Sequence, residues 1–105
     1  MRKCWHLLER PRTWTQKYSG RIAMRPTVAD DPGADCWCAL GAIIKCYPDP
    51  VKQEAVVLLV SRHLERVHHV PRYHTDFDHD VITRWNDAPR RTHQEVCQVF
   101  HFLNV

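Results

Sequence analysis

Histidine and cysteine are frequent in this chain, and both side chains can bind metals or act in catalysis. The 105 residues include eight His and five Cys. The segment from His68 to His79 mixes imidazoles with carboxylates, which could ligate a metal ion. The paired spacing of zinc sites is missing, because Cys36 and Cys38 are two residues apart rather than three. We expect solvated histidines and no resident metal or cofactor, and a His/Cys metal-binding domain is only a third hypothesis.

A nucleophilic thiol needs a base within hydrogen-bond reach and a third group that orients the base. No local pattern supplies these groups. Cys36 and Cys38 lie near the start of a predicted helix, where a thiol pKa can be lowered, so they are the first candidates if the chain is an enzyme. The cysteine count is odd and the cysteines adjoin apolar stretches, which favours reduced, buried thiols. We expect no disulfide and no enzymatic activity.

Basic and aromatic residues gather in the first quarter of the chain. Residues 1–25 contain seven Lys or Arg against one Glu, with Trp5, Trp14 and Tyr18 between them. Such a composition suits phosphate contact and base stacking. No nucleic-acid-binding motif is present, however, and the net charge of +3 is low for such a protein. Nucleic-acid binding is therefore the second hypothesis.

Trp, Tyr and Arg also dominate the hot spots of protein interfaces. Several of them fall in predicted turns, where a globular domain can expose them. The candidate binding residues are Trp14, Gln16, Tyr18, Arg21, Tyr73 and Arg90. Binding to another protein is therefore the first hypothesis.

The elements that must position these residues are mainly helices. Residues 2–10 form a short amphipathic pattern that ends at Pro11. Residues 11–24 surround a Ser-Gly turn signal, as in a small hairpin, and residues 25–35 have the composition of a surface loop. From Cys36 a buried helix is predicted, with Asp35 as its cap and with Gly41 allowing a neighbouring element to approach closely.

Three more helices follow. The longest is predicted over residues 51–69, and the apolar block 55–60 marks it as the central core helix. The next helix places Phe77, Val81, Ile82 and Trp85 on one buried face. The last helix begins with Thr92-x-x-Glu95, which matches a capping box.

The corner between the last two helices organises the prediction. Trp85 anchors the first helix, Pro89 sets the turn, and Arg91 is expected to pair with Asp87. We assign structural roles to Trp37, Gly41, Trp85, Asn86, Asp87, Arg91, Thr92 and Glu95.

The length fits a single domain over residues 1–105. We expect a mainly α single-domain bundle of about five helices with a small β-hairpin after the first helix. No signal peptide and no apolar run of membrane-spanning length is recognisable, so we expect a cytoplasmic protein without a membrane partner.

Three sequence blocks run through the chain: Glu9-Arg10-Pro11-x-x-Trp14-Thr15-Gln16, Cys36-Trp37-Cys38-Ala39-Leu40-Gly41-Ala42, and Trp85-Asn86-Asp87-Ala88-Pro89-x-Arg91-Thr92-x-x-Glu95-Val96. Their order and spacing resemble a family of small proteins of unknown function from bacteria and their phages. Arg90 departs from the pattern, where glycine is expected. The resemblance implies no activity, but its phage association favours an accessory protein that counters defence or modulates the host.

Overall fold

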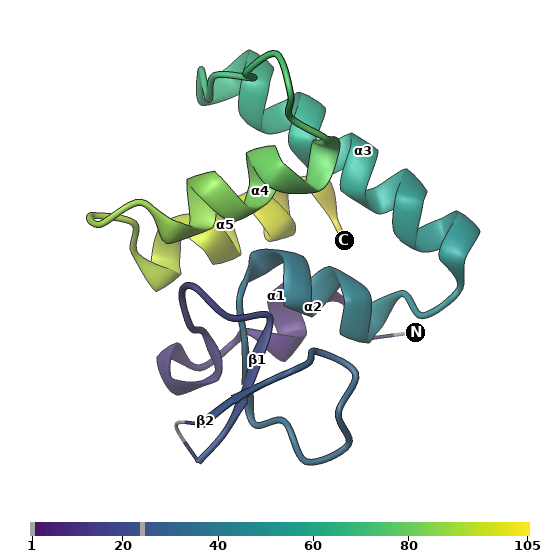
Figure 1. Cartoon of the computed structure of the whole chain (residues 1–105), viewed down its shortest axis with the longest axis vertical. Coiled ribbons are helices and arrows are strands. Elements are labelled where there is room, and N and C mark those ends of the chain that lie inside the picture. Colours follow the sequence, from purple (N-terminus) through teal and green to yellow (C-terminus); the bar gives the residue numbers. More distant parts are fainter. Residues whose placement is uncertain (1, 24) are drawn as a thin grey trace.

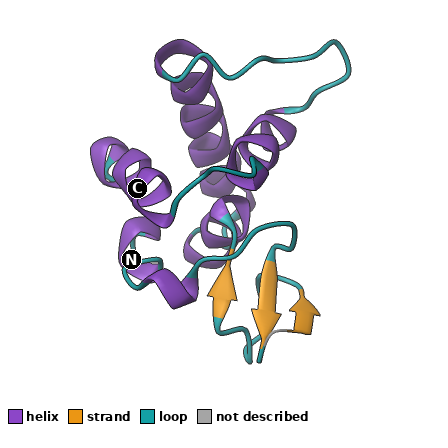
Figure 2. Cartoon of the chain, turned by 90° about the vertical axis from the view of Figure 1, so that its left-hand side faces the viewer, coloured by secondary structure: helices purple, strands orange, loops and turns teal. Residues whose placement is uncertain are grey.

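The computed structural model describes residues 2–23 and 25–105, and it is mainly helical (Figure 1). Within these residues, five α-helices are present: α1 (Cys4–Leu7), α2 (Ala39–Cys46), α3 (Pro50–Val67), α4 (Asp78–Asp87) and α5 (His93–Leu103). A three-stranded antiparallel sheet lies between α1 and α2 in the sequence and packs at one end of the helices (Figure 2). The prediction of a mainly α bundle with a small hairpin after the first helix is confirmed.

The sheet has the strand order β2-β1-β3 and consists of β1 (Gly20–Ile22), β2 (Arg25–Thr27) and β3 (Cys36–Trp37). β1 pairs with β2, Gly20 opposite Thr27, and also with β3, Gly20 opposite Trp37. The predicted hairpin turn is misplaced: Ser19-Gly20 leads into β1, and the chain turns after Ile22. Residues 25–27 are accordingly a strand rather than the start of a loop.

The N-terminal helix is shorter than predicted. α1 ends at Leu7, before it reaches Pro11, so the proline does not terminate it. Pro11 instead begins a single 3₁₀ turn, η1 (Pro11–Thr13). The Cys4 backbone N–H donates to the Val105 carbonyl, and Lys3 Nζ donates to the Asn104 carbonyl at 3.0 Å. The beginning of the chain is thus tied to the end of α5.

The second helix begins three residues later than predicted. Cys36 and Trp37 belong to β3, and the helix is capped by Cys38, whose sulfur accepts a hydrogen bond from the Gly41 N–H at 3.3 Å. Asp35 does not cap the helix; its carboxylate accepts from the Ala23 N–H at 3.0 Å. The helical spacing of apolar residues thus extends over Cys36 and Trp37, although these two residues form a strand that pairs with β1.

The third helix is long, as predicted, but it is not the central core helix. Asp49 caps it and Pro50 occupies its first turn. Only Val60, Ser61 and Leu64 are buried along its length. In Figure 1, α3 runs along the outer edge of the molecule, and it packs chiefly against α4.

The last two helices confirm most of their predicted faces. Val81, Ile82 and Trp85 are buried on α4, but Phe77 precedes the helix and is 69% exposed, so its predicted burial is wrong. Thr92 and Glu95 form the predicted capping box of α5: Thr92 Oγ1 accepts from the Glu95 N–H, and Glu95 accepts from the Thr92 N–H.

The core lies among α1, α2, α4, α5 and the second half of α3. Its largest fully buried side chains include Phe100, Leu8, Ile43 and Leu64. No helix in the described part of the chain is both long and apolar enough to cross a membrane.

Candidate functional site

The three sequence blocks meet at one buried side chain, Asn86. Its Oδ1 accepts hydrogen bonds from the Trp14 indole N–H at 2.7 Å and from the Ala39 backbone N–H at 3.0 Å. Its Nδ2 donates to the Thr15 carbonyl at 3.2 Å and to the Asp87 carboxylate at 3.0 Å. All four hydrogen-bonding positions of the amide are therefore used, as a fully buried Asn requires.

Gln16 and Asp87 extend this junction. Gln16 Nε2 donates to the carbonyls of Asn86 and Ala88, both at 2.9 Å. Asp87 accepts from the Lys17 backbone N–H at 2.8 Å. These contacts hold the segment before β1 against the end of α4. Trp14 and Gln16, two of the predicted binding residues, thus use their polar groups inside the molecule.

The corner after α4 is held by Arg91. Its Nε donates to the Trp85 carbonyl at 2.9 Å, its Nη1 pairs with Glu95 at 3.0 Å, and its guanidinium lies 4.7 Å from the Trp85 ring centroid. The predicted ion pair between Arg91 and Asp87 is wrong. The Asp87 carboxylate instead accepts hydrogen bonds from the Asn86 side-chain amide and from the Lys17 backbone N–H.

The middle block lies between the corner and the sheet. Trp37 is buried, and its indole N–H donates to the Ala29 carbonyl at 3.0 Å. Gly41 lies directly against the backbone of Ser19, where an added Cβ would be 1.8 Å from the carbonyl oxygen. Only glycine fits there.

The other predicted binding residues are distributed over separate surfaces. Tyr18 is 42% exposed, and the Arg21 guanidinium lies 5.0 Å from its ring centroid. Tyr73 is 57% exposed and is covered in the same way by Arg84, at 4.4 Å. Arg90 is exposed at the corner. Within residues 2–23 and 25–105, no hydrogen bond or ring contact links Tyr73 or Arg90 to the other four, so the six do not form one site.

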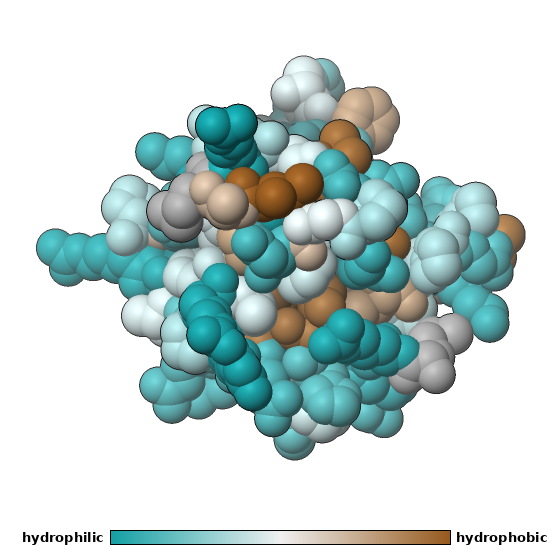
Figure 3. Space-filling model, turned by 90° about the horizontal axis from the view of Figure 1, so that it is seen from below, coloured by the Kyte–Doolittle hydropathy of each residue, from teal (hydrophilic) through white to brown (hydrophobic). Residues whose placement is uncertain are grey.

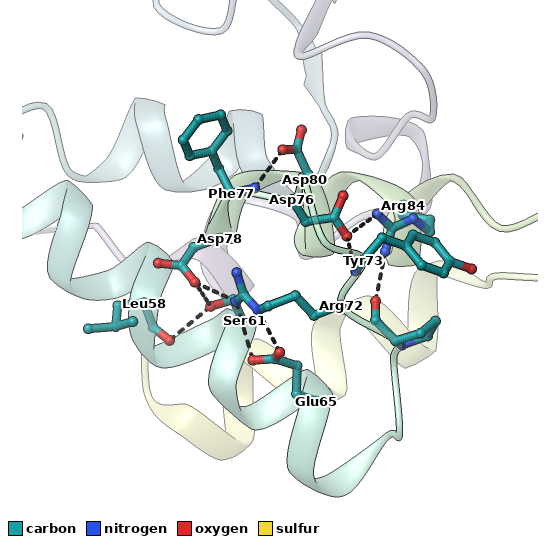
Figure 4. Close-up of polar contacts among 11 residues, drawn as sticks. Leu58, Ser61, Glu65, Arg72, Tyr73, Asp76, Phe77, Asp78, Asp80 and Arg84 are labelled. Carbon is teal, nitrogen blue, oxygen red and sulfur yellow. Dashed lines mark hydrogen bonds and ion pairs between the residues drawn. The ribbon is translucent and has the colours of Figure 1, made fainter.

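The histidine-rich link between α3 and α4 is held by arginines (Figure 4). Arg72 pairs with Glu65 of α3, at 2.6 Å, and with Asp78 of α4. The buried Ser61 hydroxyl contacts the same Asp78 at 3.1 Å. Hydrogen bonding from Arg72 lowers the pKa of Glu65 below its usual value.

A second arginine fixes the rest of the link (Figure 4). Arg84 pairs with Asp76 and donates to the Pro71 carbonyl at 2.8 Å. Hydrogen bonds to Asp76 lower the pKa of its carboxyl group; the largest effect comes from the Tyr73 backbone N–H and the next from Arg84. In the described ranges, no group of three His, Cys, Asp or Glu side chains is placed to hold a metal ion. The carboxylates of this link are occupied by arginine.

The two candidate thiols, Cys36 and Cys38, are in environments that do not activate them. Burial raises the pKa of Cys38. Burial also raises the pKa of Cys36, and the negative charge of the nearby Asp35 adds a smaller increase. The helix start does not lower either value, which corrects the expectation for these two candidates. The structure places Cys97 Sγ 3.3 Å from His93 Nε2, a pairing that the sequence analysis missed. The signal was the i, i+4 spacing on α5.

The Cys97 and His93 pair does not form a nucleophile and its base. The Leu8 carbonyl can only accept, so the contact between His93 Nε2 and this oxygen places the proton on Nε2. The Cys97 thiol also donates to the Leu8 carbonyl, at 3.2 Å. The imidazole nitrogen nearest the sulfur therefore already carries a proton, and burial raises the pKa of the thiol. Both side chains instead bind the end of α1 to α5.

The outward face of α3 carries apolar side chains that do not pack into the core. It carries Val51, Ala55, Leu58 and Leu59 at helical spacing, and all four are exposed. The exposed fractions are 76% for Val51, 41% for Leu58 and 45% for Leu59. We call these four residues the α3 apolar stripe. The sequence signal was the block 55–60, which is apolar on all sides and thus wider than one core-facing stripe requires.

A cavity of about 370 Å³ lies beside the first half of α3, on the side facing α2 and the start of α4. Its apolar wall is formed by Leu40, Ile44 and Val57, and Glu54 and His79 are at its edge. No residue of the α3 apolar stripe lines this cavity, so the stripe by itself is the candidate interaction surface.

Comparison with known proteins identifies a family for this chain. Neither the curated proteins nor the solved structures contain a match. A family model described as a family of unknown function (DUF6197) matches residues 1–102. This range includes all three blocks and every helix except the last residue of α5, so the chain belongs to the DUF6197 family.

Proposed function

We propose that this protein acts by binding another protein, through the α3 apolar stripe. The observation that supports the proposal is the exposure of Val51, Leu58 and Leu59 on a helix whose opposite side already fills the core. Burying exposed apolar surface is favourable by about 25 cal/mol per Å². A contiguous apolar face that the fold leaves in water is therefore typical of an interface.

The geometry of α3 suits a helical partner. Val51, Ala55 and Leu58 follow one another at i, i+4 and i+7, so they form one line along the helix. A partner helix that presents apolar side chains at the same spacing can pack along this line, as in helix-in-groove recognition.

The charges beside the stripe define the partner further. Lys52, Arg62 and Arg66 are exposed around it, and the exposed carboxylates of Asp49 and Glu54 lie near its start. An amphipathic helix with an acidic rim would complement this pattern.

The proposal keeps the cellular setting that the family resemblance suggests. The protein would be a non-enzymatic accessory factor of bacterial or prophage origin that acts in the cytoplasm. Its partner would be a host or phage protein, and its effect would be to counter defence or modulate the host.

Photo-crosslinking tests the proposal in cells that produce the protein. A crosslinking amino acid is placed at Leu58, and in a matched control at Val28, which is 60% exposed and lies outside α3. The proposal expects one protein to be joined through position 58 and not through position 28, and to form a stoichiometric complex with the purified chain. Capture of the same proteins from both positions, or of none, would contradict it.

A further inference from the structure

A second surface, at the opposite end of the sequence, is basic and hollow. A cavity of about 280 Å³ lies beside α1 and η1 and is lined by Arg2, Arg10, Arg12 and His6, together with Leu7, Glu9 and Thr13. The short α1 and the 3₁₀ turn after it bring these residues together, because the chain reverses at Leu8 to Pro11. The face of the molecule on the sheet side, seen from below, is largely hydrophilic (Figure 3).

The three arginines of this cavity are not neutralised inside the molecule. In the part of the chain that the structure describes, the ion-paired arginines are Arg72, Arg84 and Arg91, each held by a carboxylate. Arg2, Arg10 and Arg12 have no such partner there. The only carboxylate in the cavity, Glu9, lies 3.7 Å from His6 and is 66% exposed at its side chain.

We propose that this cavity binds a terminal phosphate group. A phosphate monoester carries about −1.5 to −2 charges at neutral pH, which the three guanidinium groups balance after Glu9 has offset one of their charges. The planar guanidinium fork can donate two hydrogen bonds to one phosphate, so arginine is suited to this role. Thr13 contributes shape only, because its hydroxyl donates to the Arg10 carbonyl at 2.7 Å.

The cavity has room for a phosphate group and for the first part of the molecule that carries it. Its volume of about 280 Å³ is several times that of one phosphate group. A neighbouring cavity of about 580 Å³ shares Arg12 and Thr13 and continues toward Asp35 and Cys36. The remainder of a phosphorylated molecule therefore has room to extend along the sheet. This site is separate from the α3 apolar stripe and does not rest on it.

Calorimetric titration at low salt tests the site with three probes: inorganic phosphate, a 5′-phosphorylated pentathymidylate, and the same oligonucleotide with a 5′-hydroxyl. We expect both phosphate-bearing probes to bind at one site and the 5′-hydroxyl oligonucleotide to bind at least tenfold more weakly. Binding of inorganic phosphate but not of the oligonucleotide would identify a small phosphorylated ligand. Equal binding of the two oligonucleotides, or no binding of either phosphate-bearing probe, would overturn the proposal.

A matched pair of variants separates this site from general attraction to positive charge. Arg10→Gln with Arg12→Gln should weaken phosphate binding at least tenfold. The double variant Arg62→Gln with Arg66→Gln removes the same charge from α3 and should leave phosphate binding unchanged. Equal weakening in both double variants would overturn the site. Thermal unfolding of each variant confirms that it is folded, and since the side chains are exposed, neither pair should change the melting temperature.

Discussion

The Trp14 indole nitrogen lies 2.7 Å from Asn86 Oδ1, although the two residues are 72 positions apart in the sequence. This hydrogen bond joins the segment before the sheet to the end of α4. The same oxygen accepts from the first residue of α2. One buried amide thus connects the three sequence blocks.

Removing this amide should destabilise the whole fold. Asn86→Ala leaves the Trp14 indole and the Ala39 N–H without an acceptor in a buried site, which costs about 1–3 kcal/mol for each group. We expect a loss of about 3 kcal/mol or more in the free energy of unfolding, measured by urea denaturation. Gln94→Ala, an exposed change on α5, is the control. A change below about 0.5 kcal/mol for Asn86→Ala would contradict the role of the junction.

Gly41 should not tolerate even one methyl group. Gly41→Ala gains about 1 kcal/mol of helix propensity but places its Cβ 1.8 Å from the Ser19 carbonyl oxygen, which belongs to backbone and cannot rotate away. We expect a net loss of about 2 kcal/mol or more. Gly33→Ala is the control, since its Cβ would meet the flexible Ile22 side chain at 3.1 Å. If Gly41→Ala raises the melting temperature, the close approach of Ser19 is wrong.

The link network should respond to acid. Folding lowers the pKa of Glu65 below its usual value of 4.5. The ion pair of Glu65 therefore stabilises the fold fully above pH 4.5, and this contribution is lost as the pH falls through the pKa of the folded protein. Arg72→Gln should therefore destabilise the protein at pH 7, and its difference from the wild type should shrink at pH 3. Arg66→Gln should have little effect at either pH. An Arg72→Gln difference of the same size at both values would show that the ion pairs do not contribute.

Double-mutant cycles should distinguish the two possible partners of Arg91. Arg91 pairs with Glu95 at 3.0 Å, so replacing both by alanine should give a coupling of about 0.5 kcal/mol in unfolding experiments. The cycle of Arg91 with Asp87 should be additive within about 0.3 kcal/mol. Strong coupling to Asp87 would restore the ion pair expected from the sequence.

Features that depend on neighbouring residues are predicted better from the sequence than features that depend on tertiary contacts. Thr92 and Glu95 cap α5 as their spacing indicates, because a capping box is complete within four residues. The start of α2 was misplaced because Cys36 and Trp37 fit a helical period, yet their backbones pair with β1. That pairing depends on residues far away in the chain and leaves no local signal.

The candidate interaction surface shows the same limit. The apolar block 55–60 predicted a helix correctly, but no periodicity could show which of its sides the core would use. Val60 is fully buried, whereas its neighbour Leu59 is 45% exposed. The junction at Asn86 was likewise only partly foreseen: the corner residues were assigned structural roles, but Trp14 and Gln16 were assigned to binding.

The affinity of the protein captured through position 58 tests the central claim most directly. Isothermal titration should compare the wild type with Leu58→Glu and with the control Val28→Glu, after both variants are shown to melt like the wild type. We predict at least tenfold weaker binding for Leu58→Glu, because a carboxylate would interrupt the α3 apolar stripe, and unchanged binding for Val28→Glu. Equal affinity of all three proteins would contradict the claim that α3 is the binding surface.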